Sequence, residues 1–246
     1  RIIRAFMDGT RFGIGMDALG LLHAGDGKNA LTWMDAMVDG IPVTPRHGYP
    51  VEINALWYNA LCFARDLTAD FGEPSFFEGD FIPRLRRSFT ETFWNWGDDA
   101  ASSVAGGHDA ASCYQGRLGD VFCNGVLDTA VRPNQIFAVS LPFSPLDPAE
   151  QTAVVRAVRE QLLTPCGLRT LSPADPAYRG RYWGNPAERD GAYHQGTVWP
   201  WLLGAFGEAA LRVADDPERE KENLRQYLRT FLSQHLVEAG IGNVSE

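Results

Sequence analysis

The segment 31–59 concentrates the side chains with which this sequence could perform acid–base chemistry on a sugar. Trp33, Asp35, Arg46 and Glu52 follow one another there, around a turn-rich connection. A carboxyl group can protonate a glycosidic oxygen or activate a water molecule, and a guanidinium group can form paired hydrogen bonds with hydroxyls. An indole ring offers an apolar face to the C–H surface of a pyranose. These residue types are therefore typical of a carbohydrate site.

Ordinary structural roles compete with this interpretation. Trp57 recurs with neighbouring apolar residues at helical spacing, which favours a place in the core. A single aspartate such as Asp35 is more often a helix or turn carboxylate that faces water. Glu52 fits the first turn of a helix, where the helix dipole stabilises a negative charge. Residue types and spacing alone leave the sugar site open.

Three longer motifs resemble one protein family and occur in that family's order. The first is TWMDA with VTPRHG and PVEINALWYNAL (32–61), the second is RPNQIFA (132–138), and the third is YHQGTVWPW (193–201). The sequence resembles the C-terminal amylo-α-1,6-glucosidase domain of glycogen debranching enzymes from about Phe12 onward, with one looser stretch at 97–118. The resemblance implies an all-α fold, an (α/α)6 toroid of paired helices.

The resemblance also implies a reaction and two catalytic residues. The family releases glucose from the α-1,6 branch points of glycogen or limit dextrin by an inverting mechanism that needs two carboxylates. By correspondence, Asp35 is the general acid and Glu246 the general base. Trp33 beside Asp35 is expected to shield the carboxyl from water and so to raise its pKa.

A set of substrate-binding residues follows from the same correspondence. Glu52 is expected to bind substrate rather than to catalyse. For the RPNQ residues, bracing of a loop is as good an interpretation as binding of sugar hydroxyls. His194 and Gln195 could instead be hydrogen-bonding residues at a helix start, and Trp201 could belong to the core. The implied substrate-binding residues are Trp33, Arg46, Glu52, Arg132, Asn134, Gln135, Asp190, His194, Gln195 and Trp199.

Two other functions stay open. Aromatic and carboxylate side chains also bind sugars without cleaving them, so a non-catalytic glucan-binding fragment is one alternative. A toroid hydrolase of another linkage preference, glucoamylase-like or trehalase-like, is the other. The sequence has no zinc-protease, nucleophile-elbow, phosphate-loop or dinucleotide motif, so neither a metal nor a cofactor is expected.

The bulk composition is that of an ordinary globular domain. The 246 residues are 45% hydrophobic and 22% charged, with a net charge of −9, which disfavours nucleic acid as a partner. No apolar run is long enough to span a membrane. The four cysteines lack zinc-site spacing and are expected to be free thiols of a cytoplasmic protein. The oligomeric state stays open.

Apolar periodicity and capping residues predict about seven helices, separated by long connections at 12–48 and 165–195 and by a polar loop at 97–118. No run of alternating strands is expected. The helices are predicted at 1–9, 51–69, 81–94, 135–139, 148–163, 197–213 and 218–237.

The family's toroid has twelve helices, so we expect residues 1–246 to form a single partial domain that lacks the first helices and the last one. Glu246 is the terminal residue, and a terminal side chain is normally frayed. We therefore expect the 246 residues alone to release little glucose from limit dextrin compared with a version that contains the remaining helices. Equal rates per mole would show that the base lies elsewhere.

Overall fold

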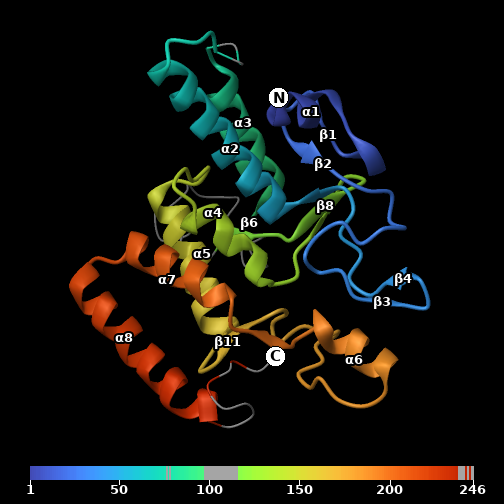
Figure 1. The fold of residues 1–246 in the computed structure, drawn as a ribbon, viewed down its shortest axis with the longest axis vertical. Coiled ribbons are helices and arrows are strands. Elements are labelled where there is room, and N and C mark those ends of the chain that lie inside the picture. Colours follow the sequence, from blue (N-terminus) through green and yellow to red (C-terminus); the bar gives the residue numbers. More distant parts are fainter. Residues whose placement is uncertain (76, 78, 97–115, 238–241, 243, 245–246) are drawn as a thin grey trace, which may run out of the picture.

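The computed structural model describes residues 1–75, 77, 79–96, 116–237, 242 and 244, and these residues form a helix-rich fold (Figure 1). Glu246 and most of the polar loop predicted at 97–118 lie outside the described residues. The α-helices are α1 (Ile2–Asp8), α2 (Val51–Asp70), α3 (Phe81–Phe93), α4 (Phe137–Ser140), α5 (Pro148–Gln161), α6 (Pro186–Tyr193), α7 (Leu202–Val213) and α8 (Pro217–Gln234).

Short strands and 3₁₀ turns connect these helices. The 3₁₀ turns are η1 (Arg11–Gly13), η4 (Pro133–Ile136) and η5 (His235–Val237). The strands are β1 (Gly15–Met16), β2 (Leu22–His23), β3 (Met37–Val38), β4 (Ile41–Pro42), β5 (Tyr49–Pro50), β6 (Trp94–Asn95), β7 (Arg117–Leu118), β8 (Val121–Cys123), β9 (Val126–Asp128), β10 (Leu163–Thr164), β11 (Gly167–Arg169) and β12 (Val198–Trp199).

The longer helices pack in a row. Helices α2 and α3 lie side by side at one end, and α7 and α8 lie at the other (Figure 1). Between them, α4 packs against both α2 and α7, and α5 packs against α4 and α7. Burial of one apolar face per helix explains this arrangement. The fully buried core side chains include Leu61, Phe89, Phe93, Ile136, Val154, Val158, Leu162 and Leu202.

The capping signals in the sequence set the helix starts. Asp147 accepts a hydrogen bond from the backbone N–H of Glu150, whose carboxylate accepts one from the backbone N–H of Asp147, each at 2.8 Å. This capping box confirms the predicted start of α5. The predictions for α2, α3 and α8 are confirmed to within a few residues.

The prediction of an all-α fold is only partly confirmed, because small antiparallel sheets occur among the described residues. A closed toroid is not confirmed either. The helix predicted from residue 197 begins at Leu202, because Val198–Trp199 pairs with β11 instead. The connection 165–195 contains α6, which the sequence analysis missed although Asn185 and Glu188 form another capping box.

Two of the sheets join distant parts of the chain. In one, Tyr49 pairs with Phe122 and Pro50 with Val121, which brings the start of α2 beside β8. In the other, Leu168 pairs with Trp199, which fixes the third sequence motif against the segment after α5. These pairings, together with α6, lie largely to one side of the helix row (Figure 1). They bring the three motifs to one region.

Gly48 adjoins the first of these sheets and should tolerate no side chain. Its φ is +95°, and a Cβ there would lie 2.6 Å from the carbonyl oxygen of Phe122. Gly40 is a matched control, since its φ is +77° and no atom lies within 4 Å of the corresponding position. We expect Gly48→Ala to lower the free energy of unfolding by about 1–3 kcal/mol more than Gly40→Ala. Urea denaturation measures both, and equal losses would contradict the predicted clash.

Candidate active site

Trp33 joins the three sequence motifs in space. Its indole N–H donates to Oδ1 of Asn134 over 2.7 Å. Its ring meets those of His194 and Trp201 edge to face, with centroids 5.2 Å and 5.1 Å apart. The fold thus brings together side chains of all three motifs: Trp33 of the first, Asn134 of the second, and His194 and Trp201 of the third.

Asp35 lies two residues further on and is exposed. Its negative charge acts to raise the pKa of His194, against the larger lowering by burial. The structure therefore does not show the expected shielding of the Asp35 carboxyl group from water by Trp33. The Asp35 carboxylate is thus open to solvent.

A buried ion cluster lies beneath this region. Arg46 donates two hydrogen bonds to the two oxygens of Glu52 and two more to those of Asp120, including Nε to Oδ2 of Asp120 at 2.8 Å. All three residues are at most 6% exposed. Burial acts to lower the pKa of Arg46, but the charges of Asp120 and Glu52 outweigh it and raise the pKa above its ordinary value. Arg46 therefore stays charged.

Arg132 carries a second buried positive charge and braces the third motif. Its Nη1 donates to the backbone oxygens of His194 at 2.7 Å and Thr170 at 3.1 Å, and its Nη2 donates to Oε1 of Gln195 at 2.7 Å. Burial lowers the pKa of Arg132, and the nearby charge of Arg46 adds to this effect. These contacts of Arg132 with the third motif agree with loop bracing, one of the two interpretations of the RPNQ residues.

The other predicted binding residues differ in accessibility. Gln135 is buried and donates to the backbone oxygen of Arg132. Asp190 is half-buried on α6. Trp199 is 9% exposed and donates its indole N–H to the backbone oxygen of Tyr193. Their roles in substrate binding stay predictions.

The sequence analysis missed Asp120. Asp120 is 2% exposed and contacts both Arg46 and Asn134. The signal that could have identified it in the sequence was a charged residue within a short, otherwise apolar strand pattern. Trp201 belongs to the third motif, with a place in the core as the alternative interpretation, and it is 51% exposed. Its ring also stacks on Phe137, with centroids 6.1 Å apart. Trp57, by contrast, is 5% exposed, which confirms its place in the core.

His194 should make stability depend on pH. Burial lowers its pKa from 6.5 to about 4, with Arg132 and Arg46 adding to the shift and Asp35 opposing it. Between pH 4 and 6.5 the unfolded chain therefore binds a proton that the folded protein does not, so acid destabilises the fold, by on the order of 2 kcal/mol for this group.

The variant His194→Phe keeps an aromatic ring but cannot titrate. We expect its free energy of unfolding, measured in urea at pH 7 and pH 4.5, to fall less with acid than that of the wild type. Other groups that titrate in this range affect both proteins alike, so the difference isolates His194. Identical losses in the two proteins would contradict the prediction.

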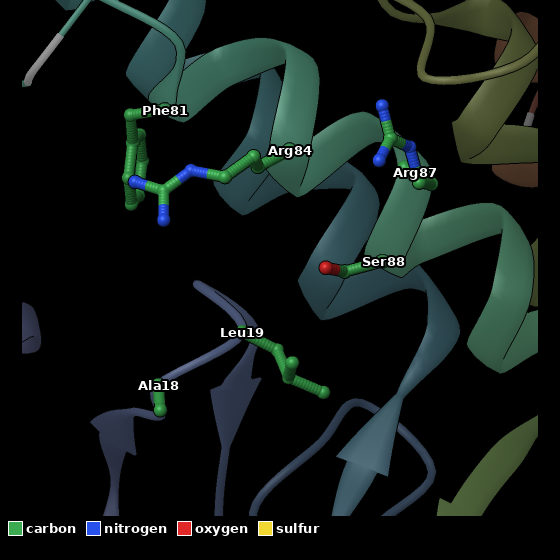
Figure 2. Close-up of a pocket in the computed structure, with 6 residues that line it drawn as sticks. All are labelled: Ala18, Leu19, Phe81, Arg84, Arg87 and Ser88. Atoms are coloured by element: carbon green, nitrogen blue, oxygen red, sulfur yellow. The ribbon is translucent and has the colours of Figure 1, made fainter.

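Two pockets are lined by residues other than the predicted site residues. One, of 410 Å³, is lined mainly by apolar residues of α1 and α2, including Trp57. The other, of 160 Å³, lies between Leu19 and helix α3, where Arg84 lies beside Phe81 while Arg87 points in another direction (Figure 2). Neither pocket holds a carboxylate among its lining residues. They do not suit acid–base hydrolysis.

The described residues contain neither a candidate metal site nor a candidate membrane-spanning helix. No group of three or more histidine, cysteine, aspartate or glutamate side chains in the described ranges could hold a metal ion. No helix among the same residues is long and apolar enough to cross a membrane. Cys62, Cys123 and Cys166 are not joined in disulfides, and Cys113 lies outside the described ranges.

The fold and the site define a helix-rich domain with an exposed carboxylate beside aromatic and guanidinium groups. The sequence model of the amylo-alpha-1,6-glucosidase family matches residues 1–246. The chain therefore belongs to this family. It is 32% identical over 221 residues to the glycogen debranching enzyme of Saccharomyces cerevisiae, an alignment that covers 76% of this chain. The chain spans only 14% of the length of that relative.

Proposed function

We propose that this domain is a glycosidase that releases glucose from α-1,6 branch points of glycogen or limit dextrin, in the cytoplasm. The observation that supports the proposal most directly is that Asp35 is exposed only two residues after Trp33, whose ring contacts that of the exposed Trp201. The family match and the relative's name agree with a branched glucan as substrate. The exposed face of Trp201 is suited to stack on a pyranose ring.

The proposed mechanism inverts the anomeric configuration. Asp35 protonates the leaving glycosidic oxygen, and a second carboxylate about 6.5–9.5 Å away takes a proton from water. Glu246 is the proposed base on the strength of the sequence resemblance. Glu52 is a poor candidate for that role, since both its oxygens accept hydrogen bonds from Arg46 and it is 2% exposed.

Substrate comparison tests the proposal against its alternatives. Two proteins are assayed in parallel, the 246 residues alone and the longest polypeptide that contains them. The assay measures glucose released from limit dextrin, isomaltosyl, maltosyl and trehalose substrates. We expect the longer polypeptide to release glucose from limit dextrin and isomaltosyl substrates, with β-glucose as the first product, and the 246 residues alone to release little. Preference for maltosyl substrates or trehalose would favour a glucoamylase-like or trehalase-like hydrolase. Glucan binding without any release would favour a non-catalytic module.

A further inference from the structure

The loop that carries Asp35 has few backbone hydrogen bonds of its own. Among the described residues, positions 31–36 take part in one backbone–backbone hydrogen bond. In it, the oxygen of Ala36 accepts from the N–H of Val43 at 2.9 Å. No helix or strand covers these positions. A carboxyl group that must protonate a substrate needs a fixed position, since a displacement of about 1 Å can cost on the order of 10²-fold in rate. Side chains must therefore hold this loop.

Asn134 is the side chain that does so. Its Oδ1 accepts from the indole N–H of Trp33 at 2.7 Å, and its Nδ2 lies 3.6 Å from the sulfur of Met34. Met34 is 1% exposed and Asn134 is fully buried. The two residues that immediately precede Asp35 are thus anchored on one amide group of η4.

The orientation of that amide depends on Asp120. An amide can be turned to exchange its oxygen and nitrogen, and its partners decide which way it faces. The Nδ2 group of Asn134 donates to Oδ1 of Asp120 at 2.7 Å, which leaves Oδ1 of Asn134 facing Trp33. Asp120 is itself held by Arg46, through Nε to Oδ2 at 2.8 Å and Nη2 to Oδ1 at 3.0 Å.

We propose that Asp120 is a positioning residue for Asp35, acting through Asn134 and Trp33. Both oxygens of Asp120 face donors only. An asparagine at this position would turn its own N–H₂ group toward either Asn134 or Arg46, so one donor would face another donor. A turn of the Asn134 amide relieves that conflict and breaks its hydrogen bond to Trp33. The loop before Asp35 then loses its anchor.

The first test needs no turnover. The indole N–H signals are observed by ¹H–¹⁵N NMR, and that of Trp33 is assigned with Trp33→Phe. In Asp120→Asn we expect the Trp33 signal to shift and its exchange with solvent to accelerate at least about tenfold, as expected when an indole N–H loses its buried acceptor. Glu52→Gln is the matched control, because it removes the other negative charge on Arg46 without touching Asn134, and its Trp33 signal should stay in place. An unchanged Trp33 signal in Asp120→Asn, or an equal change in Glu52→Gln, overturns the proposal.

The second test measures the consequence for Asp35 and rests on the proposed function. We expect Asp120→Asn to lower kcat on an α-1,6-linked glucan by about 10- to 100-fold at nearly unchanged KM. Hydrolysis of α-glucosyl fluoride, whose leaving group needs little protonation, should fall much less. The core variant Val158→Ala, which only weakens packing, should keep the wild-type ratio of the two rates. Equal losses on both substrates in Asp120→Asn overturn the proposal.

Two outcomes keep the inference separate from the proposed function. If the longest polypeptide that carries these residues hydrolyses neither substrate in its wild-type form, the proposed function fails, while the Trp33 signal still decides whether Asp120 sets the anchor. If Asp120→Asn does not fold, Asn134→Ala replaces it, because it removes the relay and leaves Asp120 paired with Arg46. The Trp33 signal should then show the same loss, and a Trp33 signal like that of the wild type counts against the relay.

Discussion

Asp35→Asn should abolish most hydrolysis of α-1,6-linked glucan, with kcat reduced about 10²-fold or more. The substitution removes the proposed proton donor but keeps the size of the side chain. Asp35 is exposed, so the loss of its charge should change the free energy of unfolding by less than about 0.5 kcal/mol. Initial rates on limit dextrin, with glucan binding measured by calorimetry, check this separation of catalysis from binding.

The leaving group provides the internal control for Asp35. Fluoride departs with little help from an acid, so Asp35→Asn should hydrolyse α-glucosyl fluoride at a rate much closer to that of the wild type. A second control is Asp39→Asn, at another exposed carboxylate of the same connection. It should leave both rates unchanged. Wild-type turnover of limit dextrin by Asp35→Asn would end the assignment of Asp35 as the general acid.

Arg46→Met should produce the largest loss of stability, about 3–5 kcal/mol in the free energy of unfolding. Methionine fills part of the volume of the side chain but leaves Glu52 as a buried carboxylate without its partner, and Asp120 with only the longer 3.6 Å pair to Arg132. Both are at most 2% exposed, so water cannot replace the lost hydrogen bonds without a structural change. Urea denaturation at pH 7 measures the effect.

Arg65→Met is the matched control for Arg46→Met. Arg65 pairs with Asp66 at 2.7 Å, but each side chain is 46% exposed. A pair so open to solvent contributes about 0–1 kcal/mol, so this substitution should be nearly neutral. Equal losses in the free energy of unfolding would mean that the buried cluster of Arg46, Glu52 and Asp120 stabilises the fold no more than an exposed ion pair does.

Local signals in the sequence were sufficient for most of the helices. The Asp147-Pro148 pair and the apolar period of α2 predict elements that the structure confirms, because capping and one-sided burial act over a few neighbouring residues. The same rule would have found α6 from Asn185 and Glu188. The strands were not predictable in this way, since a two-residue strand such as β12 exists only by pairing with β11.

The sequence by itself determined the family and the residue types of the site, because the motifs around Asp35, Asn134 and His194 are long and ordered. Only the tertiary structure decided which of these side chains are available to a ligand. Arg46 and Glu52 satisfy each other in a buried cluster, whereas Trp201 is exposed. Asp120 joined the site through contacts to Arg46, 74 positions away, and to Asn134. Burial and pairing of charges depend on how distant segments pack, and no local pattern in the chain contains that information.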